Sequence, residues 1–544
     1  MRILSCLIWH LTVLVVASSA WAQADAPPQK AQAIVVRPAA WASALTAWKL
    51  HRAEQGIEIV EVDSELGQNE IKKTIVSAYQ TATDHSGASQ LKFVLLCGDV
   101  GPESEDGIAT YYRESRALVQ FGGDKNLATD NPYADIDGDE LPDLALGRIP
   151  ADNIDQLQAA MQRIVWYETQ ADNSMWRRNV HVVAGVGGFG AVADSVIEMT
   201  TRKFLGDRIP GWARVTMTQA STGSHYCPDP VVFSDAVIGK LNEGGMFWVY
   251  IGHGHVETLD QMRVERDFYP IMDVRNLSQV NVPTTPPIAI FLACYTGAMD
   301  ASRDSLAERM VLSKNGPIAA VAASRVSGPY GLAMLSNGML SGFYERRMNT
   351  LGEIVTFAKR EAMKELTQSA DTDPSLKMID AIAQALSPKD YDLRAERQEH
   401  VWQVQLIGDP MLRISHVIQM PIEVTKTVQP GGVVEVRGQA SLDGSLTIEL
   451  THRRTDKRRE LDKIGVDWRT EAGRAAYVQR YSAANDGVIK KVQRNVRGGD
   501  SFAIPLEVPA DLGRGRYSVR AFVESAESWQ AGYAETAVRP ARAR

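Results

Sequence analysis

Two segments of the sequence place a reactive side chain directly after an apolar run. His253 lies in Gly252-His253-Gly254, behind the run 248–251, and Cys294 follows the run 290–293. A thiolate is a strong nucleophile, and a nearby imidazole both lowers the pKa of the thiol and can protonate a leaving amine. Glycine at position 254 lets its N–H face a developing oxyanion, and the N–H of Cys294 is the second candidate donor. The pattern predicts nucleophilic catalysis by a Cys-His dyad.

The cysteines also have plainer interpretations. A cysteine at the end of a strand is most often a small hydrophobic residue. Cys97 ends another apolar run, but Asp99 follows closely and its negative charge opposes thiolate formation, so we assign Cys97 a structural role. Cys227, in Tyr226-Cys227-Pro228, is a loop residue that is either free or a disulfide partner.

Other catalytic patterns are weaker. His253 and His255, with Glu257 or Asp260, have the spacing of metal ligands, but no second histidine pair follows, so metal catalysis is not expected. The glycine-rich stretch 185–190 lies between a predicted strand and a predicted helix, as in dinucleotide-binding proteins, yet glycine spacing alone is a weak signal. The sequence has no G-x-S-x-G nucleophile elbow.

The composition is that of a globular protein. The chain has 544 residues, of which 44% are hydrophobic and 23% charged. The net charge of −8 provides no global positive field, so nucleic acid is not an expected partner.

The first residues are typical of a secretory signal peptide. Arg2 supplies one positive charge, an apolar stretch follows, and Ala20 and Ala22 are small residues at the positions that a signal peptidase reads. We expect cleavage after residue 22 and export to the periplasm, the cell surface or the medium. No later apolar run is long enough for a transmembrane segment. Removal of Cys6 with the signal would leave three cysteines, so at least one thiol stays unpaired within the chain.

From residue 33 to about 414, strand-like runs alternate with segments of helical apolar spacing. This alternation predicts an α/β domain with a parallel sheet that is covered by helices on both faces. Ligands bind such sheets at the carboxyl ends of the strands, where we expect the loops after Asp99, Gly252 and Ala293. The expected strands are 33–36, 57–62, 91–97, 180–184, 215–219, 246–251, 288–293 and 317–323, and the expected helices are 40–56, 69–81, 154–169, 193–205, 232–242, 305–313, 331–347 and 352–366.

After about residue 416 the pattern changes to short alternating strands separated by turns such as Pro430-Gly431-Gly432. We expect strands at 422–428, 433–437, 445–453, 501–508 and 515–523 with no helix between them, which predicts an immunoglobulin-like β-sandwich. Residues 451–500 contain 13 Lys and Arg against 7 Asp and Glu. This stretch is either a solvated irregular segment or a docking surface for an acidic wall or partner.

Several motifs, in order along the chain, resemble those of the gingipain family of cysteine peptidases. The similarity spans residues 33–414 and implies a caspase-like α/β catalytic domain in two subdomains, with sheets of parallel type flanked by helices. The motifs are Leu95-Leu96-Cys97-Gly98-Asp99, the segments 129–134 and 142–150, Gly252-His253-Gly254, Ala293-Cys294, Ser305-Leu306-Ala307-Glu308 and Leu406-Ile407-Gly408-Asp409-Pro410.

The resemblance also implies roles for single residues. Cys294 is the nucleophile, His253 the acid/base, and Gly254 with Cys294 the pair of oxyanion-hole amides. His255 is the weaker alternative for the imidazole, because Val256 rather than glycine follows it. The motifs do not place the residue at the base of the primary specificity pocket. They also leave open which acidic residue orients the histidine, and the candidates are Asp194, Glu198, Asp229 and Asp235.

The implied arrangement has four parts. Residues 1–22 are the signal peptide and residues 23–150 the N-terminal α/β subdomain of the catalytic unit. Residues 151–416 form the catalytic subdomain with the dyad, and residues 417–544 form the immunoglobulin-like domain.

Carboxylates gather in one turn, where Asp135, Asp137, Asp139 and Asp143 suit the oxygen coordination of calcium. The turn is not an EF-hand, because its glycine stands at the fourth position and a leucine at the twelfth. It is either a structural calcium site or a solvated acidic turn, and no cofactor is expected for catalysis.

Together these features predict an exported cysteine endopeptidase that hydrolyses protein or peptide substrates through a thioester. The same dyad could instead pass the acyl group to an amine, as a sortase-like transpeptidase does. A non-catalytic surface or adhesion protein is the alternative from a different class, and in it Cys294 would be unreactive. The C-terminal domain is the candidate for association with a cell surface or wall.

Overall fold

The computed structural model describes residues 31–100, 106–169, 174–187, 208–366, 374–456, 461–462, 465–526 and 528–539. The predicted signal peptide and the predicted helix 193–205 lie outside the described residues.

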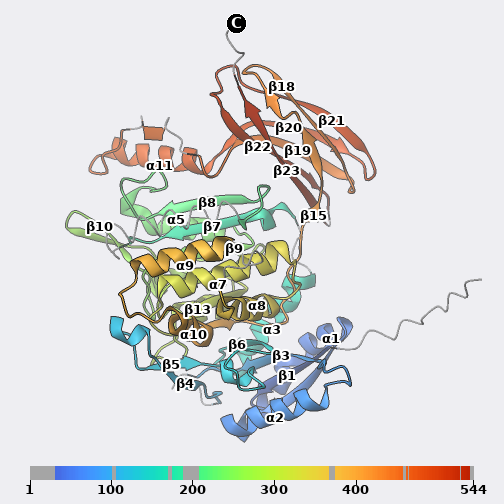
Figure 1. The fold of residues 1–544 in the computed structure, drawn as a ribbon, viewed down its shortest axis with the longest axis vertical. Helices are drawn as coiled ribbons and strands as arrows, with labels where there is room; N and C mark the ends of the chain where they lie inside the picture. Colours follow the sequence, from blue (N-terminus) through green and yellow to red (C-terminus); the bar gives the residue numbers. More distant parts are fainter. Residues whose placement is uncertain are drawn as a thin grey trace, which may run out of the picture.

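One ten-stranded sheet, in the order β2-β1-β3-β6-β14-β13-β12-β9-β7-β8, forms the centre of the α/β region (Figure 1). Neighbouring strands are parallel except at β13 and β14, which are antiparallel. The predicted α/β class is thereby confirmed, with two parallel halves that run in opposite directions. The bounds are β1 Ala31–Arg37, β2 Ile57–Asp63, β3 Leu91–Cys97, β6 Ala145–Ile149, β7 Asn179–Ala184, β8 Arg214–Gln219, β9 Phe247–Ile251, β12 Ile288–Leu292, β13 Ala319–Ala323 and β14 Val404–Ile407.

The antiparallel junction bears on the expected position of three loops. Asp99 follows β3, whereas Gly252 and Ala293 follow β9 and β12 in the other half. Because the two halves run in opposite directions, β3 itself ends towards the opposite edge of the sheet. The segment that follows Asp99 nevertheless reaches the loop after Ala293, where the Tyr112 hydroxyl donates to Asp300 at 3.0 Å. The loops after Gly252 and Ala293 do lie side by side, since β9 and β12 are parallel neighbours.

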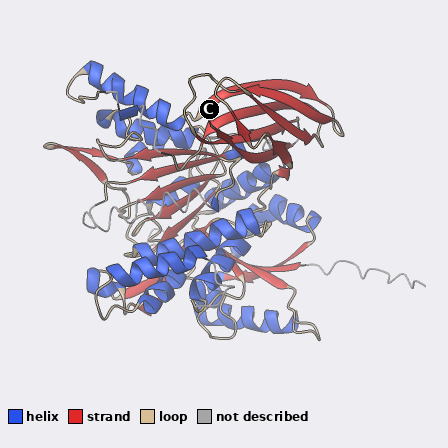
Figure 2. Ribbon diagram, turned by 45° about the horizontal axis from the view of Figure 1, so that its top comes forward, coloured by secondary structure: helices blue, strands red, loops and turns tan. Residues whose placement is uncertain are grey.

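Helices cover both faces of the sheet, as Figure 2 shows, because successive side chains of each strand point to opposite faces. Val249 and Ile290 join the apolar cluster of one face, and Tyr250 and Phe291 join that of the other. The first face carries α1 Thr46–Glu54, α3 Ile154–Thr169, α7 Pro329–Leu340, α8 Leu351–Met363 and α9 Pro374–Leu386, and the second carries α2 Gln68–Thr81, α5 Phe233–Asn242 and α6 Leu306–Leu312.

Several elements have no counterpart in the sequence prediction. Helix α10, Leu393–Gln403, packs against α7 and α8 but buries charged side chains, among them Glu396 and Glu399, so it shows no apolar stripe. Helix α9 and the short strands β4 Tyr111–Glu114, β5 Asn126–Thr129, β10 Gln261–Val264 and β11 Asp267–Pro270 were also missed.

The C-terminal region contains two further sheets around a shared apolar core. One has the order β15-β23-β22-β19-β20 with β17 paired to β23, and the other has the order β16-β18-β21. The bounds are β15 Ile418–Gln419, β16 Ile422–Val424, β17 Thr427–Val428, β18 Val433–Gln439, β19 Gly444–His452, β20 Val488–Val496, β21 Ser501–Glu507, β22 Gly515–Glu524 and β23 Trp529–Val538.

The expectation that this region has no helix is wrong. Helix α11, Glu471–Asn485, lies between β19 and β20 in the sequence and packs on the α/β region, beside β8 (Figure 1). The Asn485 side chain accepts a hydrogen bond from the N–H of Met217 at 2.7 Å and donates one to the Met217 carbonyl at 3.0 Å. These bonds cap the outer edge of β8, which is the last strand of the sheet. Helix α11, which lies within the basic stretch 451–500, is therefore ordered against the chain's own α/β region.

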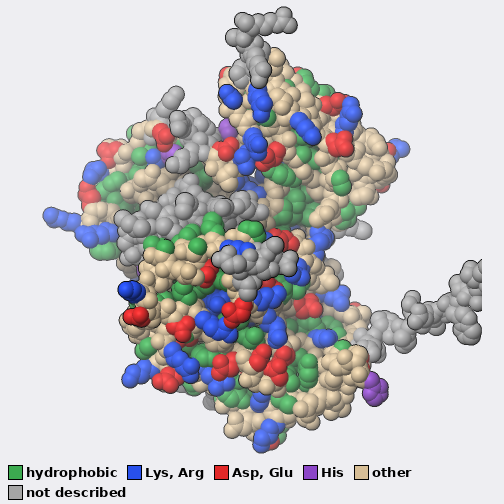
Figure 3. Space-filling model, viewed as in Figure 1, with side chains coloured by type: hydrophobic (Ala, Val, Ile, Leu, Met, Phe, Trp, Pro, Cys, Tyr) green, Lys and Arg blue, Asp and Glu red, His purple; other side chains and the backbone are tan. Residues whose placement is uncertain are grey.

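Figure 3 shows basic and acidic side chains interspersed over the visible face of the molecule. Among the described helices, none combines the length and the apolarity that a membrane crossing requires.

Candidate active site

Four neighbouring parallel strands, β13, β12, β9 and β7, end at the same edge of the sheet. The segments that follow them carry Ser327, Cys294, His253 and Gly187 respectively. All four residues line one cavity of about 940 Å³. The two residues that the sequence singles out for catalysis are thus brought to a single cavity.

The thiol of Cys294 is partly buried. The backbone N–H of Ser327 donates to its Sγ at 3.3 Å. Burial raises the pKa of the Cys294 thiol, while hydrogen bonds from the N–H groups of Ser327 and of Cys294 itself oppose that rise. The next residue, Tyr295, has a φ of +54°, a strained conformation for a residue with a side chain.

The imidazole of His253 is oriented by the backbone. Its Nε2 lies 2.9 Å from the carbonyl oxygen of Gly187, and its own carbonyl accepts a hydrogen bond from the Tyr250 hydroxyl at 2.7 Å. Gly187 has a φ of +81°, which favours glycine and turns its carbonyl at this point. With Nε2 facing a carbonyl, we assign the proton of the neutral imidazole to Nε2, so that Nδ1 is the nitrogen without a proton.

Gly254 touches the segment that carries Cys294. A Cβ at this position would lie 2.6 Å from the carbonyl oxygen of Cys294, 2.8 Å from Cγ2 of Thr296 and 3.0 Å from Cβ of Ala293. Real Cβ atoms essentially never approach a neighbour within 3.0 Å. Only glycine therefore permits the contact that joins the histidine loop to the cysteine loop.

The glycines of the stretch 185–190 that are described serve this site. A Cβ on Gly185 would lie 2.8 Å from the Tyr250 hydroxyl oxygen, and a Cβ on Gly252 would lie 2.7 Å from it. The fully buried Tyr250 fills the space that both glycines leave. Glycine-rich turns after two neighbouring strands were the sequence signal for this arrangement, but the backbone contact of Gly187 has no signature of its own.

The candidates for the acid that orients His253 are only partly described. Asp194 and Glu198 lie outside the described residues. Asp229 caps a short 3₁₀ helix by accepting from the N–H of Val231 at 3.0 Å, and Asp235 lies in the first turn of α5. The alternative imidazole, His255, is exposed.

Cys97 and Cys227 are both fully buried, and the structure has all three described cysteines as free thiols. Burial raises the pKa of Cys97 well above its usual value and that of Cys227 to about 12. Neither residue is disulfide-bonded in the structure, and burial favours the protonated form of both thiols.

The acidic turn brings together Asp135, Asp137 and Asp143, whose carboxylate oxygens lie within 4.8 Å of one another. Asp139 is not part of this group, and its carboxylate accepts from the N–H of Leu141 at 2.8 Å. The oxygen donors fit a calcium ion in kind.

Positive side chains also reach this turn. Lys72 contacts the backbone carbonyl of Asp135, and Arg360 donates to Asp143 at 3.1 Å. Backbone N–H groups of Gly138 and Glu140 donate to the carboxylate of Asp135. The turn is therefore partly neutralised and braced by the chain itself.

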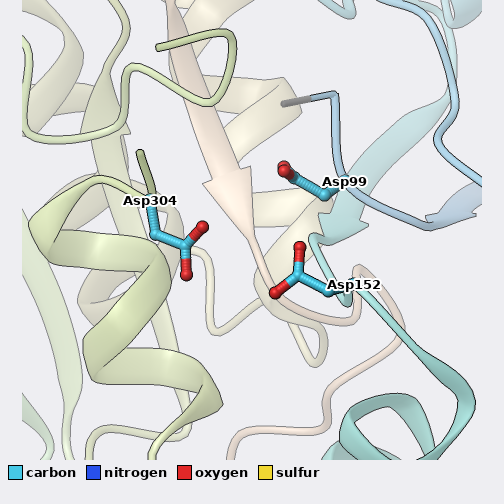
Figure 4. A group of neighbouring side chains, drawn as sticks. All are labelled: Asp99, Asp152 and Asp304. Atoms are coloured by element: carbon cyan, nitrogen blue, oxygen red, sulfur yellow. The ribbon is translucent and has the colours of Figure 1, made fainter. Parts of the chain in front are cut away.

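A second acidic group, which sequence reasoning missed, consists of Asp99, Asp152 and Asp304 (Figure 4). Their carboxylate oxygens also lie within 4.8 Å of one another. Asp99 follows β3 and Asp152 follows its neighbour β6, so strand ends on one edge were the available signal. Asp304 comes from the segment before α6, which no local pattern connects with the other two residues.

The family model of peptidase family C25 matches residues 26–415. No curated protein matches the chain.

Solved structures share the fold at low sequence identity. The Arg-specific cysteine proteinase gingipain R is 13% identical, with 94% of this chain and 98% of that chain covered and a TM-score of 0.53. The complex of Porphyromonas gingivalis RgpB pro- and mature domains is 13% identical, with coverage of 93% and 100% and a TM-score of 0.52. A structure described only as a protease is 14% identical, with coverage of 94% and 97% and a TM-score of 0.54. The chain therefore belongs to peptidase family C25 and is a cysteine-type endopeptidase.

Proposed function

We propose that this endopeptidase cleaves peptide bonds with Cys294 as the nucleophile and His253 as the acid/base. The observation that carries the proposal is the contact of Gly254 with the Cys294 carbonyl, which joins the two loops at one cavity. Membership of a peptidase family implies protein substrates.

The proposed mechanism uses the two side chains that line the cavity. Nδ1 of His253 takes the proton of the thiol, and the thiolate sulfur bonds to the carbonyl carbon of the substrate. The oxyanion that forms accepts hydrogen bonds from the N–H groups of Gly254 and Cys294. Collapse of this intermediate breaks the C–N bond, and His253 returns its proton to the leaving amine. Water then hydrolyses the thioester, with His253 accepting the proton of the water.

Because burial raises the pKa of Cys294, we expect the resting thiol to be protonated and to need this base. The carbonyl of Gly187 stabilises the imidazolium by accepting from its Nε2–H.

The test is cleavage of a mixed-sequence peptide library by the reduced full-length protein. The wild type and Cys227→Ala, a matched change at a buried thiol, should both cut the library, and Cys294→Ala should not. Cleavage by Cys294→Ala at the wild-type rate would contradict the proposal. Addition of a primary amine separates hydrolysis from acyl transfer, because a transpeptidase would give amide products in place of the free acid.

We further propose that the chain is exported and that residues 417–544 form an immunoglobulin-like domain that associates with a cell surface or wall. Support comes from the character of residues 1–22 and from the two sheets packed around one core. Secreted protein that still carries residues 1–22, or a chain lacking residues 417–544 that binds cells as well as the full chain, would contradict these assignments.

A structural calcium ion at Asp135, Asp137 and Asp143, with Asp139 beside them, is a further proposal. The donor set fits in kind, while Lys72 and Arg360 supply positive charge that weakens the need for a cation. Calcium should raise the melting temperature of the wild type and not that of Asp137→Asn. Equal shifts in both proteins would place any bound calcium elsewhere.

A further inference from the structure

The cavity beside Cys294 is walled mainly by apolar side chains among the described residues that line it. It extends from the strand ends along one face of the sheet, towards helices α7, α8 and α9. Phe247 and Ile290 of the sheet line it on one side, and Met339 of α7 and Ile379 of α9 line it on the other. Its volume of about 940 Å³ is in the upper range of pockets that bind small molecules, so even the largest side chains fit.

The mouth of the cavity is apolar as well. Phe121, Val186 and Leu386 line it and are 54%, 40% and 44% exposed. Phe121 also packs edge to face on Tyr391, with ring centroids 5.3 Å apart. Large apolar side chains that gather in water around a cavity mark a binding surface. This surface is continuous with the dyad, because Cys294 lines the same cavity.

Glu396 is the single acidic side chain among the described residues of the lining. It is 3% exposed, and its Oε1 accepts from the N–H of Gly331 in the first turn of α7 at 3.0 Å. The hydroxyl of Tyr391 forms a hydrogen bond with the same carboxylate. The charge of Glu396 is thus used to stabilise the start of α7, where a carboxylate is favoured.

We infer that this cavity is the primary specificity pocket and that the enzyme cleaves after large apolar residues such as Phe, Leu and Met. The inference rests on the proposed function, because the pocket holds the residue whose carbonyl Cys294 attacks. Binding improves with the apolar area that leaves water. A guanidinium or ammonium group would lose its hydration in this pocket without gaining an uncommitted carboxylate partner among the described residues.

The first test compares peptides that differ only in the residue before the cut, with Phe, Leu, Ala, Arg or Lys at that position. Phe and Leu should exceed Arg and Lys by on the order of 100-fold in kcat/KM. The ratio is measured within one preparation, so it does not depend on the folded fraction. Equal or faster cleavage after Arg or Lys would overturn the inference.

Variants test the walls of the pocket. Ala333→Trp on α7 fills the cavity and should shift the preference from Phe towards Ala by at least about 10-fold. Ala381→Trp on the exposed side of α9 is the matched control and should leave the preference unchanged. Glu396→Gln should also keep the preference for Phe. If Glu396→Gln loses a cleavage after Arg that the wild type performs, Glu396 recognises a basic residue and the inference is overturned.

Labelling separates failure of the pocket from failure of the proposed function. Peptidyl chloromethyl ketones that end in Phe or Arg alkylate the nucleophile without any peptide hydrolysis. Faster labelling of Cys294 by the Phe reagent, with no cleavage of any peptide, would support the pocket and contradict the proposed function. Cleavage after Arg by Cys294 would support the proposed function and contradict the apolar pocket. If Cys294 is neither labelled nor cleaves any peptide, both the pocket and the proposed function are contradicted.

Discussion

Gly254→Ala is the substitution whose effect the structure defines most sharply. The new Cβ would need to move from 2.6 Å to about 3.4 Å from the Cys294 carbonyl oxygen, a displacement of about 0.8 Å. Thr296 and Ala293 block the neighbouring directions at 2.8 and 3.0 Å, so the two loops must separate. A misplacement of about 1 Å costs on the order of 100-fold in rate, and the loss of one oxyanion-hole donor costs about 100- to 1,000-fold.

We therefore expect kcat/KM to fall about 100- to 1,000-fold in Gly254→Ala, with a loss of about 1–3 kcal/mol in the free energy of unfolding. The assay is hydrolysis of the best library peptide, normalised to folded protein by thermal unfolding. Gly239→Ala on α5 is the matched control, because a Cβ there meets nothing within 4 Å, and it should keep full activity. If Gly254→Ala retains more than a third of the wild-type kcat/KM, the proposed contact between the loops is refuted.

Three further predictions concern backbone and side-chain contacts. Gly187→Ala places a side chain at a φ of +81°, so the carbonyl that holds His253 should move and kcat should fall about 10- to 100-fold. Gly187→Asn should lose less of its kcat. The control Gly67→Ala, at a φ of +75° far from the dyad, should keep its activity. Burial lowers the pKa of His181 to about 4, so the folded state binds fewer protons than the unfolded state between pH 4 and 6.5. The contribution of His181 to the free energy of unfolding should therefore be fully present above pH 6.5 and fall by about 3 kcal/mol as the pH drops to 4. In urea titrations, the free energy of unfolding of His181→Gln should depend less on pH than that of the wild type. Asn485→Ala removes both bonds to the backbone of Met217, so it should cost about 1–3 kcal/mol and speed hydrogen exchange at that amide; unchanged exchange would refute the capping of β8.

Local patterns were enough to predict much of the α/β region. Residues 91–97 and 154–169 have the predicted bounds as β3 and α3, because apolar periodicity within each segment decides its structure. The positions of His253 and Cys294 at strand ends followed from the same patterns. These signals lie within a few residues of sequence.

Features set by distant partners could not be predicted in this way. Strand β14 pairs with β13 and β6, which precede it by some 80 and 250 residues, so neither its direction nor the reversal of the sheet is visible locally. Helices α10 and α11 bury polar and charged side chains such as Glu399 and Arg480 against other parts of the chain. The group that Gly187 contributes to the site is its backbone carbonyl, and the type of a residue does not predict what its carbonyl contacts.

The most direct test of the account is acid trapping of the covalent intermediate. The full-length protein is mixed with the best library peptide, quenched within the first turnover and digested for mass spectrometry. The account predicts that the N-terminal part of the substrate is bound as a thioester to Cys294, and that His253→Ala lowers its amount without moving it. An acyl group on Cys97, on Cys227 or on a hydroxyl side chain, or turnover with no acyl group on Cys294, would contradict the account.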